Sequence, residues 1–157
     1  MRCDFFWYRR VPSFHWAGVV QTLLVIGLSE DNYVLTISKE FHFSASHVLR
    51  ELPLDHPCGR MHGHNYIVVI ELSAPPDRLS KAGFVRDFGE LDVVKSWIDA
   101  EIDHRHLNDV LGGLNPSAEQ IAQWIFDNWK EKFPELTAIR VSETPRTWAE
   151  YRPLVHG

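Results

Sequence analysis

Residues 58–73 read CGRMHGHNYIVVIELS and hold the most informative pattern in the 157-residue chain. Residues 65–73 are rich in β-branched and aromatic side chains, which predicts a strand that a Pro-Pro pair ends. The triplet His62-Gly63-His64 directly precedes this strand. Residues two apart on an extended chain point to the same face, so both imidazoles can reach one metal ion.

A third metal ligand can come from the segment upstream. Residues 33–43, YVLTISKEFHF, predict another strand, and His47 follows it closely. If the two strands pair as a hairpin, His47 lies beside His62 and His64. Three neutral imidazoles with an open fourth position form a common catalytic zinc arrangement, so we expect a Zn²⁺ site here.

The downstream half supplies the remaining elements. A short strand is predicted at 84–88, and apolar residues at helical spacing predict helices over 89–102 and 117–132. Two final strands, 137–143 and 147–152, resemble a hairpin. Strands, then helices, then strands predict an α+β domain with an antiparallel sheet.

Length and composition limit the classes of function. A chain of 157 residues suggests one domain. The formal charge of −5, with 16 basic and 21 acidic residues, argues against a nucleic-acid-binding surface. The chain has only two cysteines, Cys3 and Cys58, so a secreted disulfide framework is not expected and a cytoplasmic location is.

Residues 1–32 differ from the rest of the chain. An apolar run at 16–28 follows two arginines and superficially resembles a secretory signal, but it contains Gln21 and no cleavage site follows it. The run is also shorter than the roughly 20 residues that span a membrane. We therefore expect an N-terminal extension without a membrane role, followed by one domain over 33–157.

Cys58 lies four residues before His62, in a polar loop. Its thiol is a fourth metal ligand, which would close the site, or an acid/base group just off the metal. An inert buried cysteine is the third interpretation, which the polar loop disfavours. A nearby cation favours the reactive thiolate. Asp103-His104 is a carboxylate beside an imidazole, a pair that can orient or relay a proton if folding brings it to Cys58.

Six motifs in this order resemble the 6-pyruvoyl-tetrahydropterin synthase and 6-carboxytetrahydropterin synthase family, the pterin enzymes of the T-fold. The resemblance covers roughly residues 34–152 and implies a four-stranded antiparallel sheet with two helices packed on one face. The motifs are Phe43-Ser44-Ala45-Ser46-His47, Cys58-x3-His62-Gly63-His64-Asn65-Tyr66, Asp87-Phe88, Asp103-His104-x2-Leu107-Asn108, Asn115-Pro116-Ser117-Ala118-Glu119 and Glu143-Thr144.

The resemblance also implies roles for single residues. It makes the three histidines zinc ligands and assigns proton transfer to a triad of Cys58, Asp103 and His104. Glu143 matches the acid that anchors the guanidine-like edge of the pterin, as a carboxylate can do through paired N–H donors. Glu119, with Ser117 nearby, matches a second stretch that lines the pterin pocket.

The spacing of the cysteine motif indicates the branch of the family. Three residues separate Cys58 from His62, the short spacing typical of the bacterial 6-carboxytetrahydropterin branch. The resemblance thus implies conversion of 7,8-dihydroneopterin triphosphate to 6-carboxytetrahydropterin, acetaldehyde and triphosphate, in 7-deazapurine (queuosine-type) biosynthesis. It further implies a homohexamer of two stacked trimers. Candidates for holding the triphosphate are Arg60, Arg146 and Lys81.

Three alternatives stay open on the sequence. A 6-pyruvoyl-tetrahydropterin synthase would use the same metal and thiol but retain all side-chain carbons. A non-enzymatic zinc module would use Cys58 as its fourth ligand. A zinc hydrolase would need a general base like that of a His-Glu-x-x-His helix, and no such motif is present.

Overall fold

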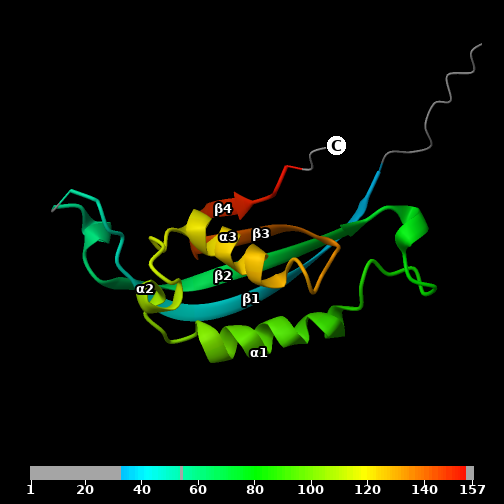
Figure 1. The fold of residues 1–157 in the computed structure, drawn as a ribbon, viewed down its shortest axis with the longest axis horizontal. Coiled ribbons are helices and arrows are strands. Elements are labelled where there is room, and N and C mark those ends of the chain that lie inside the picture. Colours follow the sequence, from blue (N-terminus) through cyan, green and yellow to red (C-terminus); the bar gives the residue numbers. More distant parts are fainter. Residues whose placement is uncertain (1–32, 54, 155–157) are drawn as a thin grey trace, which may run out of the picture. The chain divides into compact units, whose positions relative to one another are not determined.

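The computed structural model describes residues 33–53 and 55–154, so the expected extension lies outside the described residues. Its four strands form one antiparallel sheet in the order β1-β2-β3-β4 (Figure 1). The strands are β1 (Leu35–His47), β2 (His62–Ala74), β3 (Leu136–Thr144) and β4 (Thr147–Tyr151). Each strand pairs with its neighbour in sequence, which confirms the predicted hairpins.

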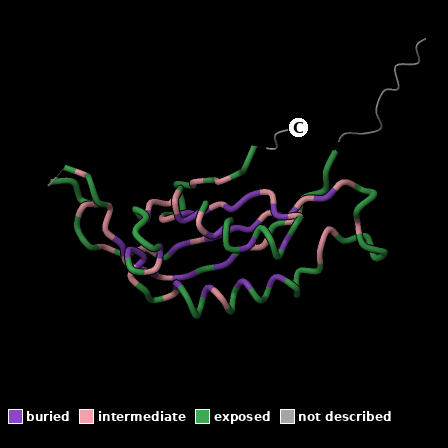
Figure 2. Tube along the Cα trace, in the orientation of Figure 1, coloured by how far each residue is buried: buried purple, intermediate pink, exposed green. Residues whose placement is uncertain are grey.

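The helices cover one face of this sheet. They are α1 (Asp92–Glu101), the single turn α2 (Leu107–Val110) and α3 (Ala118–Trp129). Alternate strand residues such as Phe41, Phe43 and Val68 form one apolar core with the buried faces of α1 and α3. The tube in Figure 2 shows this alternation as buried segments along the strands. The α+β prediction, with two main helices on one face of an antiparallel sheet, is confirmed.

The strand predicted at 84–88 is wrong. This segment is a turn that leads into the 3₁₀ helix Phe88–Leu91, so α1 begins three residues later than the predicted helix. The Asp87 side chain accepts a hydrogen bond from Gly89 N at 2.7 Å, which caps the 3₁₀ turn. Phe84 and Phe88 are 50% and 51% exposed, so this aromatic-rich run buries no strand face. Local capping outcompeted the strand propensity.

Two segments at one end of the sheet position the candidate site. The end of β1 pairs with the start of β2, with His47 opposite His62 and Ala45 opposite His64. Residues 104–106 run along the free edge of β1, where His104 N donates to Ser44 O and Ser46 N donates to Arg105 O. None of the helices in the described ranges combines the length and apolar character needed to cross a membrane.

Candidate active site

His47, His62 and His64 converge at the end of the β1–β2 hairpin. One donor nitrogen from each lies within 4.8 Å of the other two. His47 is fully buried, whereas His62 and His64 are half-buried and open toward the surface. The hairpin register produces this cluster, because it places His47 and His62 side by side and the pleat returns His64 to the same face.

Bonds to backbone carbonyls determine which ring nitrogens of His47 and His62 are free to bind a metal. His47 Nδ1 lies 2.7 Å from Pro116 O, and His62 Nδ1 lies 2.8 Å from Arg60 O. A carbonyl oxygen only accepts, so both Nδ1 atoms must carry the proton and both Nε2 atoms present lone pairs. These two Nε2 atoms are 3.0 Å apart. Facing lone pairs at this distance need a cation between them, so the residues fit a metal ion.

The protonation state also suits a metal. Burial lowers the pKa of His47, although its bond to Pro116 opposes this, and the nearby His62 and His64 lower it further. Burial, followed by the nearby His62, lowers the pKa of His64. Both imidazoles are therefore neutral near pH 7, which is the form that binds a metal. The three histidines can hold a metal ion.

Cys58 lies in the 3₁₀ turn Pro57–Gly59 of the loop that joins β1 to β2. It is a half-buried free thiol, and its backbone bonds to His56 and Leu49 hold the turn in place. Among the described residues, the group of converging donor atoms consists of the three histidines and leaves Cys58 out. That arrangement favours an open metal site with the thiol beside it.

Asp103 and His104 form a tightly held pair at the edge of β1. Asp103 Oδ1 accepts from Ser44 N at 2.8 Å, and its Oδ2 lies 2.8 Å from His104 Nδ1. The bond from the Ser44 amide, ahead of the His104 contribution, lowers the pKa of Asp103, while burial opposes it. The carboxylate is therefore ionised and orients the imidazole of His104, whose side chain is 81% exposed.

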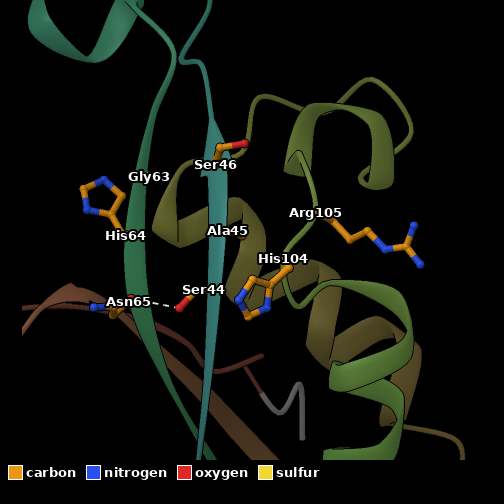
Figure 3. Close-up of a pocket in the computed structure, with 8 residues that line it drawn as sticks. All are labelled: Ser44, Ala45, Ser46, Gly63, His64, Asn65, His104 and Arg105. Atoms are coloured by element: carbon orange, nitrogen blue, oxygen red, sulfur yellow. Dashed lines mark hydrogen bonds between the residues drawn. The ribbon is translucent and has the colours of Figure 1, made fainter.

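The structure does not join this pair to Cys58 within one chain. In the described ranges, no hydrogen bond links Cys58 to Asp103 or His104. His104 instead lines a hollow of about 420 Å³ with Ser44, Ser46 and Asn65. Figure 3 shows the His104 ring beside β1, whereas the His64 ring projects on the other side of β2.

Glu143, Glu119 and Ser117 come together at a second hollow, of about 290 Å³. Glu143 Oε1 lies 3.9 Å from His47 Nε2, so this hollow adjoins the histidine cluster. Burial raises the pKa of Glu143; the nearby His62 opposes this and the nearby Glu119 adds to it. Ser117 also caps α3, where its hydroxyl accepts from Gln120 N. Trp148, which the sequence reasoning missed, lines the same hollow.

Two asparagines that the sequence reasoning left without a role hold the chain directly after His47. Asn108 Oδ1 accepts from Val48 N at 2.8 Å, and its Nδ2 donates to Val48 O at 2.9 Å. Asn115 makes the same pair of bonds to Arg50. Their places in the Leu107-Asn108 and Asn115-Pro116 motifs were the only signal in the sequence.

The structure separates the three candidate cations for the triphosphate. Arg60 lies in the loop next to the histidines, and Arg146 lies in the β3–β4 turn, two residues after Thr144. Lys81 belongs to the loop after β2, which packs near the start of β1. The 13 residues of β2 place that end roughly 40 Å from His62, so Lys81 is removed as a candidate within one chain.

Comparison with known proteins agrees with this arrangement. Residues 36–154 match the model of the 6-pyruvoyl tetrahydropterin synthase family. A 6-carboxy-5,6,7,8-tetrahydropterin synthase from Synechocystis sp. is 37% identical over 124 residues, which cover 73% of this chain and 91% of the relative. The enzyme of the same name from Bacillus subtilis is 31% identical over 137 residues, covering 80% and 90%.

The chain belongs to the 6-pyruvoyl tetrahydropterin synthase family. The 6-pyruvoyl tetrahydropterin synthase structure from Caenorhabditis elegans superposes with a TM-score of 0.67 at 24% identity, over 78% of this chain and 97% of that one. The fold is therefore the T-fold. A relative named 6-pyruvoyl tetrahydrobiopterin synthase, from Drosophila melanogaster, is 33% identical over 98 residues, covering 58% of this chain and 57% of that protein.

Proposed function

We propose that this protein is a zinc-dependent 6-carboxy-5,6,7,8-tetrahydropterin synthase. One observation carries the proposal: a three-histidine metal site adjoins a carboxylate-lined hollow, with Glu143 Oε1 only 3.9 Å from His47 Nε2. The reactive side chain of the substrate could then bind at the metal while its pterin ring binds in the adjoining hollow. The names of the Synechocystis and Bacillus relatives support the same activity.

The overall reaction balances without an outside redox partner. One water and 7,8-dihydroneopterin triphosphate give 6-carboxytetrahydropterin, acetaldehyde and triphosphate. The pterin ring gains two hydrogens while a side-chain carbon is oxidised to the carboxylate, so the redox change is internal. The protein must therefore supply proton transfers, charge stabilisation and positioning.

The histidine cluster provides the metal site. His47, His62 and His64 would hold Zn²⁺ through imidazole nitrogens, with His47 and His62 each using Nε2 because Nδ1 is bonded to a carbonyl. A bound Zn²⁺ would supply Lewis acidity to the side-chain oxygens of the substrate and make the adjacent C–H bond more acidic. Cys58, outside the donor group, stays available to move that proton.

The second hollow provides the pterin site. Glu143 offers a carboxylate to the N–H groups of the pterin edge, an arrangement in which both hydrogen bonds are charge-assisted. Glu119 and Ser117 line the same hollow and would contact the ring. Arg60 and Arg146, which lie at this end of the sheet, are the proposed triphosphate contacts.

We further propose that the working unit is a homo-oligomer, a hexamer of two trimers. Asp103 and His104 face outward at the free edge of β1, and no hydrogen bond in the described residues joins them to Cys58. An exposed imidazole held by a partly buried carboxylate is suited to reach another subunit's site. The proton-transfer triad of Cys58, Asp103 and His104 would then be completed between subunits, within the catalytic domain over 33–157.

The direct test is anaerobic incubation of the zinc-loaded protein with 7,8-dihydroneopterin triphosphate, followed by mass analysis of the pterin. We expect a 6-carboxytetrahydropterin that does not form with metal-free protein. A pyruvoyl pterin that keeps all side-chain carbons would instead assign the activity named for the Drosophila relative. No turnover by zinc-loaded protein would contradict both activities.

A structural zinc module is the alternative from another class. It requires Cys58 as a ligand, and alkylation of the thiol would then be blocked while zinc is bound. The exclusion of Cys58 from the donor group favours the enzyme.

The expected product of the enzyme is a precursor for cytoplasmic 7-deazapurine synthesis of the queuosine type.

A further inference from the structure

Tyr66 has a buried hydroxyl that nothing in the proposed chemistry has used. Its side chain is completely buried on the core face of β2. The ring stacks on Phe43 at 4.7 Å and meets His47 and His64 edge-on at 6.0 and 5.5 Å. Within the described residues its Oη has no hydrogen-bond partner.

Glu143 holds a matching acceptor. Its Oε1 is also buried and, among the described residues, also has no hydrogen-bond partner. The β2–β3 ladder pairs Val68 with Val141 and Ile67 with Ser142, so one further step brings Tyr66 opposite Glu143. Both side chains lie on the core face, where directly opposed residues have Cβ atoms about 5 Å apart.

The histidine cluster cannot supply the missing donor. His47 Nε2 lies 3.9 Å from Glu143 Oε1, but its proton sits on Nδ1, which bonds Pro116 O. Among the described residues, Tyr66 is therefore a donor without an acceptor, at the strand position opposite a residue whose buried carboxylate oxygen lacks a donor.

We propose that Tyr66 is the positioning residue of Glu143: in the substrate-bound protein its hydroxyl donates to Oε1 and turns the rest of the carboxylate toward the pterin. This inference rests on the proposed function, because it takes Glu143 as the pterin anchor. The position of Glu143 suits both contacts. Its Oε1 is buried beside His47, and the side chain also lines the open hollow. Tyr66 itself does not touch the substrate.

The test is Tyr66→Phe, which removes the hydroxyl and keeps the ring that stacks on Phe43. We expect the KM for 7,8-dihydroneopterin triphosphate to rise by about 10-fold to 100-fold, the range for a hydrogen bond to a charged group, with kcat changed by less than about threefold. Unphosphorylated 7,8-dihydroneopterin, followed by tryptophan fluorescence, should bind more weakly by the same factor. Zinc content should match that of the wild type.

Tyr151→Phe is the matched control, because Tyr151 packs on Phe126 away from the histidines. It should leave both constants unchanged. Glu143→Gln supplies the second variant: adding Tyr66→Phe to it should cost little more, because the acceptor's charge is already gone. If Tyr66→Phe does not fold, fluorine NMR of 3-fluorotyrosine-labelled protein replaces it, and Glu143→Gln must shift the signal of a buried tyrosine.

Each outcome separates the inference from the proposed function. Wild-type binding constants in Tyr66→Phe, fully additive effects of the two substitutions, or an unshifted buried tyrosine signal would overturn the role of Tyr66 alone. A lower kcat with unchanged KM would also overturn it, because positioning of the pterin acts on binding. A wild-type protein that neither binds nor converts the pterin would overturn both.

Discussion

The two ends of the sheet are held together in different ways. At the histidine end, side chains bond to the backbone: His47 to Pro116, His62 to Arg60, and Asn108 to Val48. At the opposite end, Arg86 forms ion pairs with Glu90 and with Glu135. Side-chain bonds to backbone fix the direction of a ligand atom, whereas the partly exposed ion pairs of Arg86 join charged groups and tolerate more geometries. The side chains at the histidine end are therefore the ones whose orientation is fixed most closely.

Removal of a metal ligand at the histidine end should have the largest effect on zinc content and turnover. His62→Ala leaves two imidazoles at the cluster, so we expect zinc to fall below one per chain and turnover to fall by about 100-fold or more. Elemental analysis and turnover measure this directly. His42→Ala is the control, since this exposed histidine of β1 pairs with Glu40 and is not part of the cluster. Full zinc content and activity in His62→Ala would contradict the assigned ligands.

Removal of a backbone clamp should have the next largest effect. Asn108→Ala leaves the N–H and C=O of Val48 without partners beside His47, and we expect a loss of about 1–3 kcal/mol of unfolding free energy. Weaker zinc binding should accompany it. Asn128→Ala, which breaks one exposed bond to Trp124 O in α3, should cost about 0.5 kcal/mol or less. Urea unfolding measures both variants. Equal losses of unfolding free energy would contradict the special role of the Asn108 bonds beside His47.

The Asp103 clamp predicts a pH dependence. The folded-state pKa of Asp103 lies below its ordinary value of 3.8, so its contribution to stability is present above pH 3.8 and is lost as the pH falls through the folded pKa. Asp103→Asn should therefore be less stable than the wild type near pH 7, and the difference should shrink below pH 3.8. Thermal unfolding across this range measures it. A difference that grows toward acid pH would contradict the direction of the shift.

The smallest effect should come from the opposite end. Glu90→Ala removes one partner of Arg86 but leaves the two bonds to Glu135 at 3.1 Å. We expect a change in unfolding free energy of about 0.5 kcal/mol or less and unchanged kinetic constants. A loss of activity here would contradict this prediction, because it would show that the two ends are coupled.

The sequence predicted the parts of this fold that depend on local pattern. The β-branched and aromatic content of 33–43 and 65–73 predicted both hairpin strands, and the hairpin alone is enough to bring His47 to His62. The strand predicted at 84–88 failed because the Asp87 cap and the ion pairs of Arg86 are stronger local determinants than aromatic content. Residue propensities alone do not include capping bonds or ion pairs of this kind.

Other parts of the site depend on tertiary placement that no local pattern records. The outward direction of His104 follows from its left-handed φ of 57° and from the crossing of 104–106 along β1. Tyr66 is an apolar-facing residue of an ordinary strand pattern, and only the β3 register places it opposite Glu143. The tautomers of His47 and His62 likewise require the positions of distant or loop carbonyls.

The most direct test of the central claim is the amount of acetaldehyde released for each triphosphate released by the zinc-loaded protein. The proposed reaction breaks one side-chain carbon–carbon bond for every triphosphate eliminated, so the account predicts a ratio of about one that holds throughout the time course. Triphosphate released without acetaldehyde would contradict it, because all side-chain carbons would then remain on the pterin.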